Sequence, residues 1–401
     1  MSQNHHENFE SDDVLSTLGF LSVKICQHKV SIAIQVVIFA VYTTIILANT
    51  YFFIKEFNME FFSQYITIYL SILASEITYA TALWNRSIVK KFEEEWAPFK
   101  FRSENAKEEM NQRIKKESTD IICFVKFHLF FSLLTGCVLI PVGKERTLPF
   151  AITFFEDYCH SYILEGIYLL AHPITIYMFV RFSYAILYFV SHVKFQLYTI
   201  LDIIQDISAE YDDQSDADLL DREEYQDNVN ARLLLMVTKL TELTRLASLA
   251  ASDLATYFIP PLVFSGLLVG LSIMSFFYMG DSLGYWSYFQ SSLWCITSLS
   301  TMIIYVYCGQ VFENMSETVF DAIYNVRWTT FNKSNRKIIL LTMIIFQEPM
   351  KLRFSETLSC NYELGVKIMK SLYSFAAVMA RNGKGRLLIE GKSSETERSD
   401  P

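Results

Sequence analysis

Two ionisable side chains lie inside long apolar stretches of the sequence, where a charge is costly and is often functional. Glu76 is the only charged residue between Phe61 and Asn85, and Lys126 lies in the apolar stretch 121–141. At about 1.5 Å per helical residue, both would lie near the same side of a membrane. We therefore expect them to form an ion pair that orders a helix bundle, with a functional charge as the alternative.

A second polar feature is the pair His172-Pro173, near the middle of another apolar stretch. Proline frees a backbone carbonyl and kinks a helix. The histidine is then either a polar contact inside a cavity or a core side chain with its hydrogen bonds satisfied, and the second interpretation is the simpler one. Arg181 lies close to one end of the same stretch, where a long side chain is expected to extend to the membrane interface.

The sequence contains no arrangement of residues that indicates catalysis. There is no HExxH, GxSxG or GxxxxGK[ST] motif, and these are the motifs that mark zinc, serine and nucleotide chemistry. The seven cysteines lie far apart with no CxxC, which indicates neither a zinc site nor a dense set of disulfides. We therefore expect no enzyme, no metal and no cofactor.

The elements that carry these residues are predicted to be membrane-spanning helices. A helix needs about 20 apolar residues to cross about 30 Å of hydrocarbon, and the stretch between Lys29 and Lys55 has no charge at all. Hydrophobic residues make up 52% of the 401 residues and charged residues only 19%, below the soluble norm of about a quarter. The prediction is an all-α polytopic membrane protein with spans at 30–54, 61–85, 119–141, 162–192, 254–280 and 285–308, and a weaker seventh at 363–380.

Loop charges predict the orientation of these spans. Basic residues are concentrated in 86–118 and 309–362, whereas the alternate loops contain only Lys55, Lys144 and Arg146. This places the polar segment 1–29, which does not resemble a signal peptide, in the cytoplasm. The segment 309–362, with a short helix at 338–347, is also cytoplasmic, and the tail 381–401 is outside. The net charge of −9 comes largely from the acidic segment 202–227, which is predicted to be a solvated loop.

The outer halves of several predicted spans are rich in aromatic and aliphatic side chains, with few hydrogen-bonding groups. A cavity among them would be apolar with a few hydroxyls and would suit a small volatile or lipid-like ligand. An aromatic belt at the headgroup level is the alternative for any single residue. The predicted ligand contacts are Tyr65, Tyr69, Ile72, Phe131, Leu134, Tyr162, Gly166, Trp286, Phe289 and Trp294.

Three stretches of the C-terminal third, 304–328, 336–352 and 369–380, carry recognisable features. They are a sixth helix predicted to end near Gly309, a Gln-x-Pro at Gln347, and a cluster that begins at Tyr373. In these features the chain resembles the insect odorant receptor family. The family pattern also implies a cytoplasmic helix with Ser316, Tyr324 and Trp328. Pro349 completes the Gln-x-Pro, and Ser374 and Phe375 follow Tyr373 in the cluster.

This resemblance implies a ligand-gated, non-selective cation channel in the plasma membrane of olfactory neuron dendrites. It implies a tetramer formed with a shared co-receptor subunit, the last helix lining the pore and the cytoplasmic helices anchoring the subunits. The extra cytoplasmic segment of the co-receptor is missing here, so this chain resembles a ligand-selective subunit. The implied pore residues are Tyr373, Ala376, Ala377 and Ala380, with Val378 and Met379 if the alignment shifts by one residue. Close helix packing is the alternative explanation of such a small-residue stripe.

Two other classes of membrane protein are less well supported. A G-protein-coupled receptor would have the opposite orientation, and neither an Asp-Arg-Tyr at the third span nor an Asn-Pro-x-x-Tyr in the seventh is present. A small-molecule transporter often has broken helices in matching positions of two halves. Here Pro173 and Pro260-Pro261 do not occupy matching positions.

Overall fold

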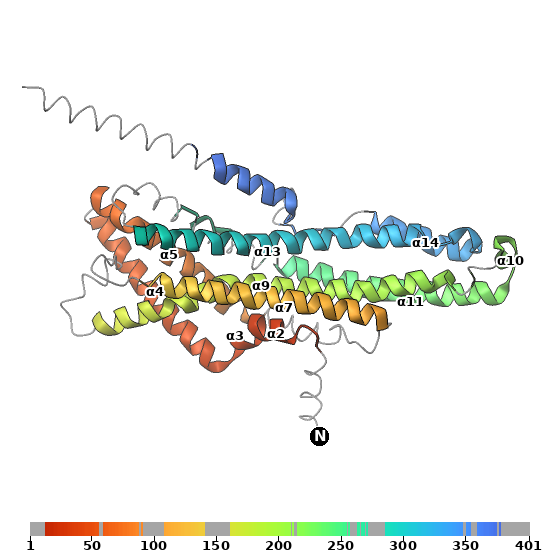
Figure 1. The fold of residues 1–401 in the computed structure, drawn as a ribbon, viewed down its shortest axis with the longest axis horizontal. Helices are drawn as coiled ribbons and strands as arrows, with labels where there is room; N and C mark the ends of the chain where they lie inside the picture. The colour runs from red at the N-terminus through yellow and green to blue at the C-terminus, as the bar shows by residue number, and fades with distance from the viewer. Residues whose placement is uncertain are drawn as a thin grey trace, which may run out of the picture.

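The chain is an elongated bundle of helices in its computed structural model (Figure 1). In the part that the structure describes, no strand occurs beyond an isolated antiparallel bridge between Arg353 and Ser359. The described residues are 13–55, 59–87, 90, 108–140, 161–209, 211, 215–254, 256, 263–264, 266–268, 270–271, 285–347, 350–353, 359–374 and 377, with some helix side chains excepted.

Five long helices coincide with predicted spans, and the predicted all-α membrane fold is confirmed. They are α4 (Lys29–Lys55), α5 (Met59–Trp84), α7 (Glu108–Val138), α9 (Ser161–Ala209) and α13 (Tyr285–Tyr324). The predicted spans 254–280 and 363–380 lie largely or partly outside the described residues.

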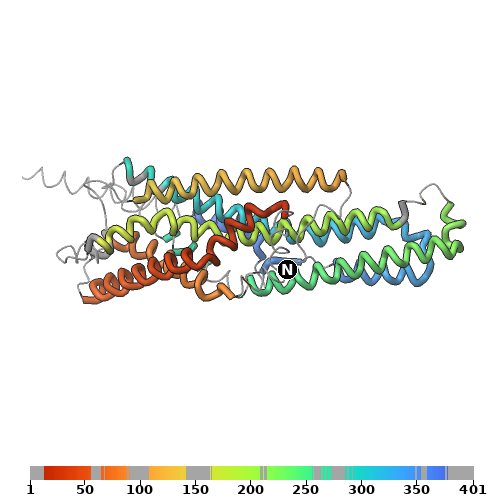
Figure 2. Tube along the Cα trace, turned by 90° about the horizontal axis from the view of Figure 1, so that it is seen from below, coloured from red at the N-terminus to blue at the C-terminus, as the bar shows by residue number. Residues whose placement is uncertain are grey.

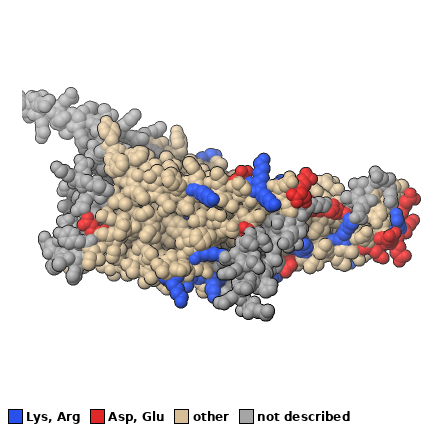
Figure 3. Space-filling model, turned by 60° about the horizontal axis from the view of Figure 1, so that its bottom comes forward, with Lys and Arg blue, Asp and Glu red and all other residues tan. Residues whose placement is uncertain are grey.

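Length and hydropathy mark four membrane-crossing segments among the described residues, at Lys29–Lys55, Glu108–Val138, Glu165–Ile207 and Ser292–Tyr324. Charged side chains gather towards the end that carries α10 and α14, whereas the opposite part of the surface is almost free of them (Figure 3). The uncharged part is the one that the hydrocarbon of a bilayer can cover.

Helix α9 is the centre of the bundle and packs against α4, α5, α7, α11 and α13. It has 49 residues, or about 73 Å at 1.5 Å per residue, so it continues about 40 Å beyond a hydrocarbon layer of about 30 Å. Figure 2 shows this extension running beside α11 and the C-terminal half of α13. The sequence prediction ended this span at residue 192, whereas the helix ends at Ala209.

The prediction of a solvated loop at 202–227 was wrong for most of that segment. Residues 202–209 belong to α9, and the helices α10 (Asp216–Leu220) and α11 (Glu223–Asp253) follow. Apolar residues at helical spacing explain this, because Tyr225, Val229 and Leu233 recur every four residues and are buried. Of the acidic side chains in this segment, Glu223, Glu224 and Asp227 lie on the exposed side of α11.

We expected a helix end near Gly309, but α13 continues unbroken to Tyr324. Of the residues expected in a separate helix, Ser316 and Tyr324 lie in α13, and Trp328 begins the short η6 (Trp328–Thr330). The predicted short helix at 338–347 is present as α14 (Lys333–Phe346).

A buried polar network joins α10, α11, η6 and α14 at the charged end of the molecule. Its centre is Gln226, whose Nε2 donates to the Thr330 carbonyl at 2.8 Å and to the Leu219 carbonyl at 3.0 Å. The Gln226 Oε1 accepts from the Asn332 N–H at 2.8 Å, and the Gln226 backbone carbonyl accepts from Asn335 Nδ2 at 2.9 Å. Because a buried polar group is costly unless it is paired, this network fixes how the four elements meet.

The N-terminal segment packs against α9 rather than extending from the bundle. It forms α2 (Ser16–Gly19), η1 (Phe20–Lys24) and α3 (Ile25–Gln27). The prediction that Arg181 extends to the membrane interface was wrong. This residue is only 4% exposed, and its Nε donates to the Ser22 carbonyl at 2.9 Å. The Tyr177 hydroxyl donates to the neighbouring Leu21 carbonyl.

Asp13 holds the start of this segment on α9. Its Oδ2 accepts from the Tyr188 hydroxyl at 2.9 Å, its Oδ1 lies 3.4 Å from His192 Nε2, and the Leu15 N–H donates to Oδ1 at 2.9 Å. Burial alone would raise the pKa of Asp13, but His192, the Leu15 N–H and Tyr188 together lower it to about 2.

We expect Asp13→Asn to release the N-terminal segment at neutral pH. The lowered pKa corresponds to about 2 kcal/mol, at about 1.4 kcal/mol per pKa unit. This contribution is present above pH 4 and is lost only as the pH falls towards 2, so acidification from pH 8 to 5 should not discharge Asp13. Hydrogen exchange of residues 16–27 in the purified full chain measures the effect, and the exposed Asp120→Asn is the control. Unchanged exchange in Asp13→Asn would contradict the prediction.

Candidate functional site

A cluster of tyrosines joins α4, α5 and α9 inside the apolar part of the bundle. The hydroxyls of Tyr42 and Tyr79 lie 3.0 Å and 3.3 Å from Thr175 Oγ1, and all three side chains are buried. The Tyr42 ring also meets Tyr168 edge to face at 6.3 Å between centroids. Hydroxyls paired across helices are the usual polar contacts inside a membrane bundle.

Glu76 of α5 does not pair with Lys126, and this prediction was wrong. The Glu76 carboxylate accepts a hydrogen bond from the Thr43 hydroxyl of α4, whereas Lys126 is exposed on α7. The reason is helix arrangement, because α5 packs against α4 and α9, whereas α7 packs against α9 and α13. Equal depth in a membrane does not place two residues on facing helices.

His172 is a core histidine with its hydrogen bond satisfied, which was the simpler of the two interpretations. Its Nδ1 lies 2.9 Å from the Tyr168 carbonyl one turn earlier, and its ring meets the Tyr168 ring edge to face at 4.8 Å. Pro173 lies inside α9. At this level α7 approaches so closely that a methyl group on Gly136 would lie 2.6 Å from Pro173 Cα.

A second polar junction joins α7, α9 and α13. His128 of α7 is 4% exposed, its Nδ1 lies 2.6 Å from the Tyr184 hydroxyl and its Nε2 lies 2.8 Å from Ser300 Oγ. A neutral imidazole donates through one nitrogen and accepts through the other, so one histidine satisfies both hydroxyls. The Phe124 ring stacks on the His128 ring with 6.0 Å between their centroids.

Two more polar contacts continue this junction along the facing sides of α7 and α13. Thr135 Oγ1 lies 3.1 Å from Thr297 Oγ1, and Gln290 Nε2 donates to the Val138 carbonyl at 2.6 Å. Together with His128 and Ser300 they form a line of polar groups, which we call the α7–α13 seam. These hydroxyls and the Gln290 amide were not predicted from the sequence, although polar residues inside apolar spans were the available indication.

Three of the predicted ligand contacts lie in the interior where α4, α5, α9 and α13 meet. Ile72 is buried in the tyrosine cluster, and the Tyr69 hydroxyl lies 3.0 Å from Thr50 Oγ1 of α4. Trp294 of α13 meets Phe179 of α9 edge to face at 6.0 Å and packs with Ala74 and Leu268.

The other predicted contacts are more scattered. Leu134, Trp286 and Phe289 are 46%, 54% and 49% exposed on the outside of the chain, whereas Tyr65 and Phe131 are partly buried. A methyl group on Gly166 would meet no atom within 4 Å, and the side chain of Tyr162 lies outside the described residues.

The predicted pore residues are only partly described. Tyr373 is 77% exposed and Ala377 is partly buried, whereas Ala376, Val378, Met379 and Ala380 lie outside the described residues.

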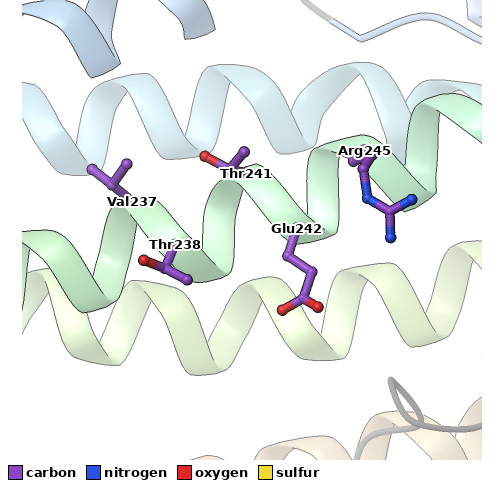
Figure 4. A pocket seen from close by; sticks show the side chains of 5 residues that line it. All are labelled: Val237, Thr238, Thr241, Glu242 and Arg245. Carbon is purple, nitrogen blue, oxygen red and sulfur yellow. The ribbon is translucent and has the colours of Figure 1, made fainter.

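A shallow surface depression on α11 is a weaker candidate for a ligand site. It is lined by Val237, Thr238, Thr241, Glu242 and Arg245, all from that one helix (Figure 4). A ligand pocket normally buries most of its ligand and draws on several elements, and this open helix face meets neither condition. The described residues also hold no His, Cys, Asp and Glu cluster with metal-binding geometry. The apolar interior with its few hydroxyls is therefore the candidate site.

The sequence and the fold of this chain are similar to those of known proteins. The family model described as 7tm Odorant receptor matches residues 58–373. Odorant receptor 46a, isoform B, of Drosophila melanogaster is 29% identical over 93 residues, and this match spans 23% of the chain and 24% of that receptor.

The fold is similar to two structures of the insect olfactory receptor OR5 from Machilis hrabei. The first has a TM-score of 0.61 at 12% identity and covers 96% of this chain and 98% of that one. The second, a complex with eugenol, has a TM-score of 0.60 at 11% identity over 94% and 98%. Because the family model matches most of the sequence, this chain belongs to the 7tm odorant receptor family.

Proposed function

We propose that this chain is the ligand-selective subunit of an odorant-gated, non-selective cation channel in the plasma membrane. Membership of the odorant receptor family is the observation that carries this proposal. The ligand would be a small apolar volatile held where α4, α5, α9 and α13 meet, beside the α7–α13 seam. The neighbouring structure with eugenol contains a molecule of this class.

The interior chemistry supports such a ligand. Ile72, Phe179 and Trp294 supply apolar surface, and the α7–α13 seam supplies hydroxyls that can each form a hydrogen bond. Ligands of about ten heavy atoms at up to about 1.5 kcal/mol per atom can shift a conformational equilibrium, provided that they bind the open state more tightly.

Assembly with a co-receptor and a cytoplasmic position of the charged end belong to the same proposal. Arg327, Lys333 and Lys337 lie at that end, in keeping with an excess of positive charge in cytoplasmic loops. The helix α14 there exposes Leu340, Leu341, Ile344 and Ile345, each more than half. An apolar face of this kind outside the membrane suits a contact between subunits.

Co-expression with the insect co-receptor under voltage clamp tests the function. The stimulus is one fixed mixture of volatile alcohols, esters and phenols, with eugenol included, and we expect an inward cation current that does not need GTP. A current that needs GTP, or no current while the chain reaches the surface, would overturn the proposal. An epitope tag at residue 1 that is labelled on intact cells would overturn the orientation.

A further inference from the structure

We propose that a clasp on the inner half of α13 couples ligand binding to the position of the helix that begins at Tyr362. This inference rests on the proposed function. The clasp consists of Gly309, Gln310 and Glu313 of α13 together with Cys360 and Asn361. In this role Gln310, Glu313 and Asn361 are positioning residues for the helix that begins at Tyr362, which would line the pore.

The first part of the clasp is a close backbone approach. A methyl group on Gly309 would overlap the carbonyl of Cys360, so only glycine lets the two backbones touch. The Cys360 thiol donates to the Tyr305 carbonyl at 3.3 Å, and its N–H donates to the Leu352 carbonyl at 2.7 Å. Cys360 is therefore held against α13 at Gly309 and Tyr305, and against the segment 350–353 through its N–H.

The second part consists of polar contacts at the start of the next helix. The Tyr362 N–H donates to Gln310 Oε1 at 3.2 Å, and Asn361 Nδ2 donates to Glu313 Oε2 at 3.0 Å. Asn361 Oδ1 accepts from the Leu364 N–H at 3.1 Å, which caps the helix. Glu313 Oε1 also pairs with Lys351 Nζ at 3.3 Å. Side chains of α13 therefore hold the first turn of the helix in place.

Helix α13 is continuous from the candidate site to the clasp. It carries Trp294 and Ser300 in the interior, and Glu313 follows thirteen residues after Ser300, about 20 Å along the axis. A rigid element with contacts at both ends can carry coupling between two sites. A shift of α13 against α7 and α9 would therefore move Asn361 and Tyr362 with it.

The helix over 362–374 has few other attachments among its described residues. Tyr362, Val366, Met369 and Tyr373 are all about half exposed or more within this chain. Gly365 packs on α13, because a methyl group there would lie 3.1 Å from a Val306 methyl. In the described part of the chain, α13 is thus the element that sets the position of this helix.

The test uses full-length chain with the co-receptor and the fixed volatile mixture as the probe. We expect Gln310→Leu and Asn361→Ala to lower the ratio of evoked to ligand-free current about tenfold at equal surface density, within the usual range of coupling between sites. Gln310→Glu keeps an acceptor for the Tyr362 N–H, so this variant should have the wild-type ratio of evoked to ligand-free current. Glu317→Gln, an exposed carboxylate one turn further along α13, is the matched control.

Hydrogen exchange of Tyr362 and Leu364 in the purified chain gives a second readout, without any current. We expect faster exchange in Gln310→Leu and wild-type exchange in Glu317→Gln. If the wild type responds to the mixture and Gln310→Leu keeps the wild-type current ratio, the clasp is overturned and the proposed function stands. If the wild type reaches the surface but gives no current, the proposed function fails and the coupling role fails with it.

Discussion

Replacing Gly309 by alanine is expected to remove most of the folded chain from the cell surface. The added methyl group would overlap the Cys360 carbonyl oxygen and carbonyl carbon, which are backbone atoms that cannot rotate away. Either α13 or the segment at Cys360 must then shift. Overpacking of this kind lowers the free energy of unfolding by about 3 kcal/mol. Because folded proteins are stable by only about 5–15 kcal/mol, such a loss should be visible as a lower melting temperature and weak surface labelling.

Other glycines of the chain provide a graded comparison for this prediction. A methyl group on Gly365 would lie 3.1 Å from a Val306 side-chain methyl, which has some freedom to move, so Gly365→Ala should cost less. A methyl group on Gly266 would meet no atom within 4 Å, so Gly266→Ala should behave as the wild type. Equal melting temperatures for the three variants would show that the approach of Cys360 to α13 is not tight in the protein.

The same glycine illustrates which parts of the fold can be predicted from the sequence. Long apolar stretches with few or no charges leave little alternative to a spanning helix. The helices α4 and α13 occupy stretches of more than 20 residues without a charge, and α5, α7 and α9 occupy stretches that contain only one or two. The ends of α9 and α13 were missed because both helices leave the membrane as amphipathic helices, and hydropathy averaged over both faces falls there. At Gly309 the glycine marked a contact between backbones rather than a helix end.

The N-terminal segment was underestimated for a related reason. Its average composition is polar, but Leu15, Leu18, Val23 and Cys26 recur at helical spacing and are buried against the bundle. Arg181 was assigned to the membrane interface from its position near the end of a span. Its actual partner, the Ser22 carbonyl, lies 159 residues away in the sequence, so no local pattern could identify it.

Contacts within the candidate site were harder to predict than the helices. Depth along a helix follows from residue number at about 1.5 Å per residue, but the rotation of each helix decides which side chains face one another. Glu76 and Lys126 satisfy the first condition and fail the second, because Lys126 is on the exposed side of α7. His128 lies two residues later on the buried side and joins three helices.

His128→Leu is expected to loosen the junction of α7, α9 and α13 and to lower the free energy of unfolding by about 3 kcal/mol. The substitution leaves the Tyr184 hydroxyl and Ser300 Oγ without the imidazole that now lies 2.6 Å and 2.8 Å away. Each buried group that loses its partner costs about 1–3 kcal/mol. Thermal unfolding of the full chain in lipid nanodiscs measures the loss.

A double-mutant cycle separates this hydrogen-bonded junction from simple loss of packing. Tyr184→Phe and Ser300→Ala should each cost about 1 kcal/mol alone. Each should cost much less in the His128→Leu background, because residues of one network are not additive. Lys126→Met, on the exposed side of α7, should leave the unfolding transition unchanged. Additive losses would mean that the imidazole and the two hydroxyls act independently. In that case His128 would not join α7, α9 and α13 as one hydrogen-bonded network.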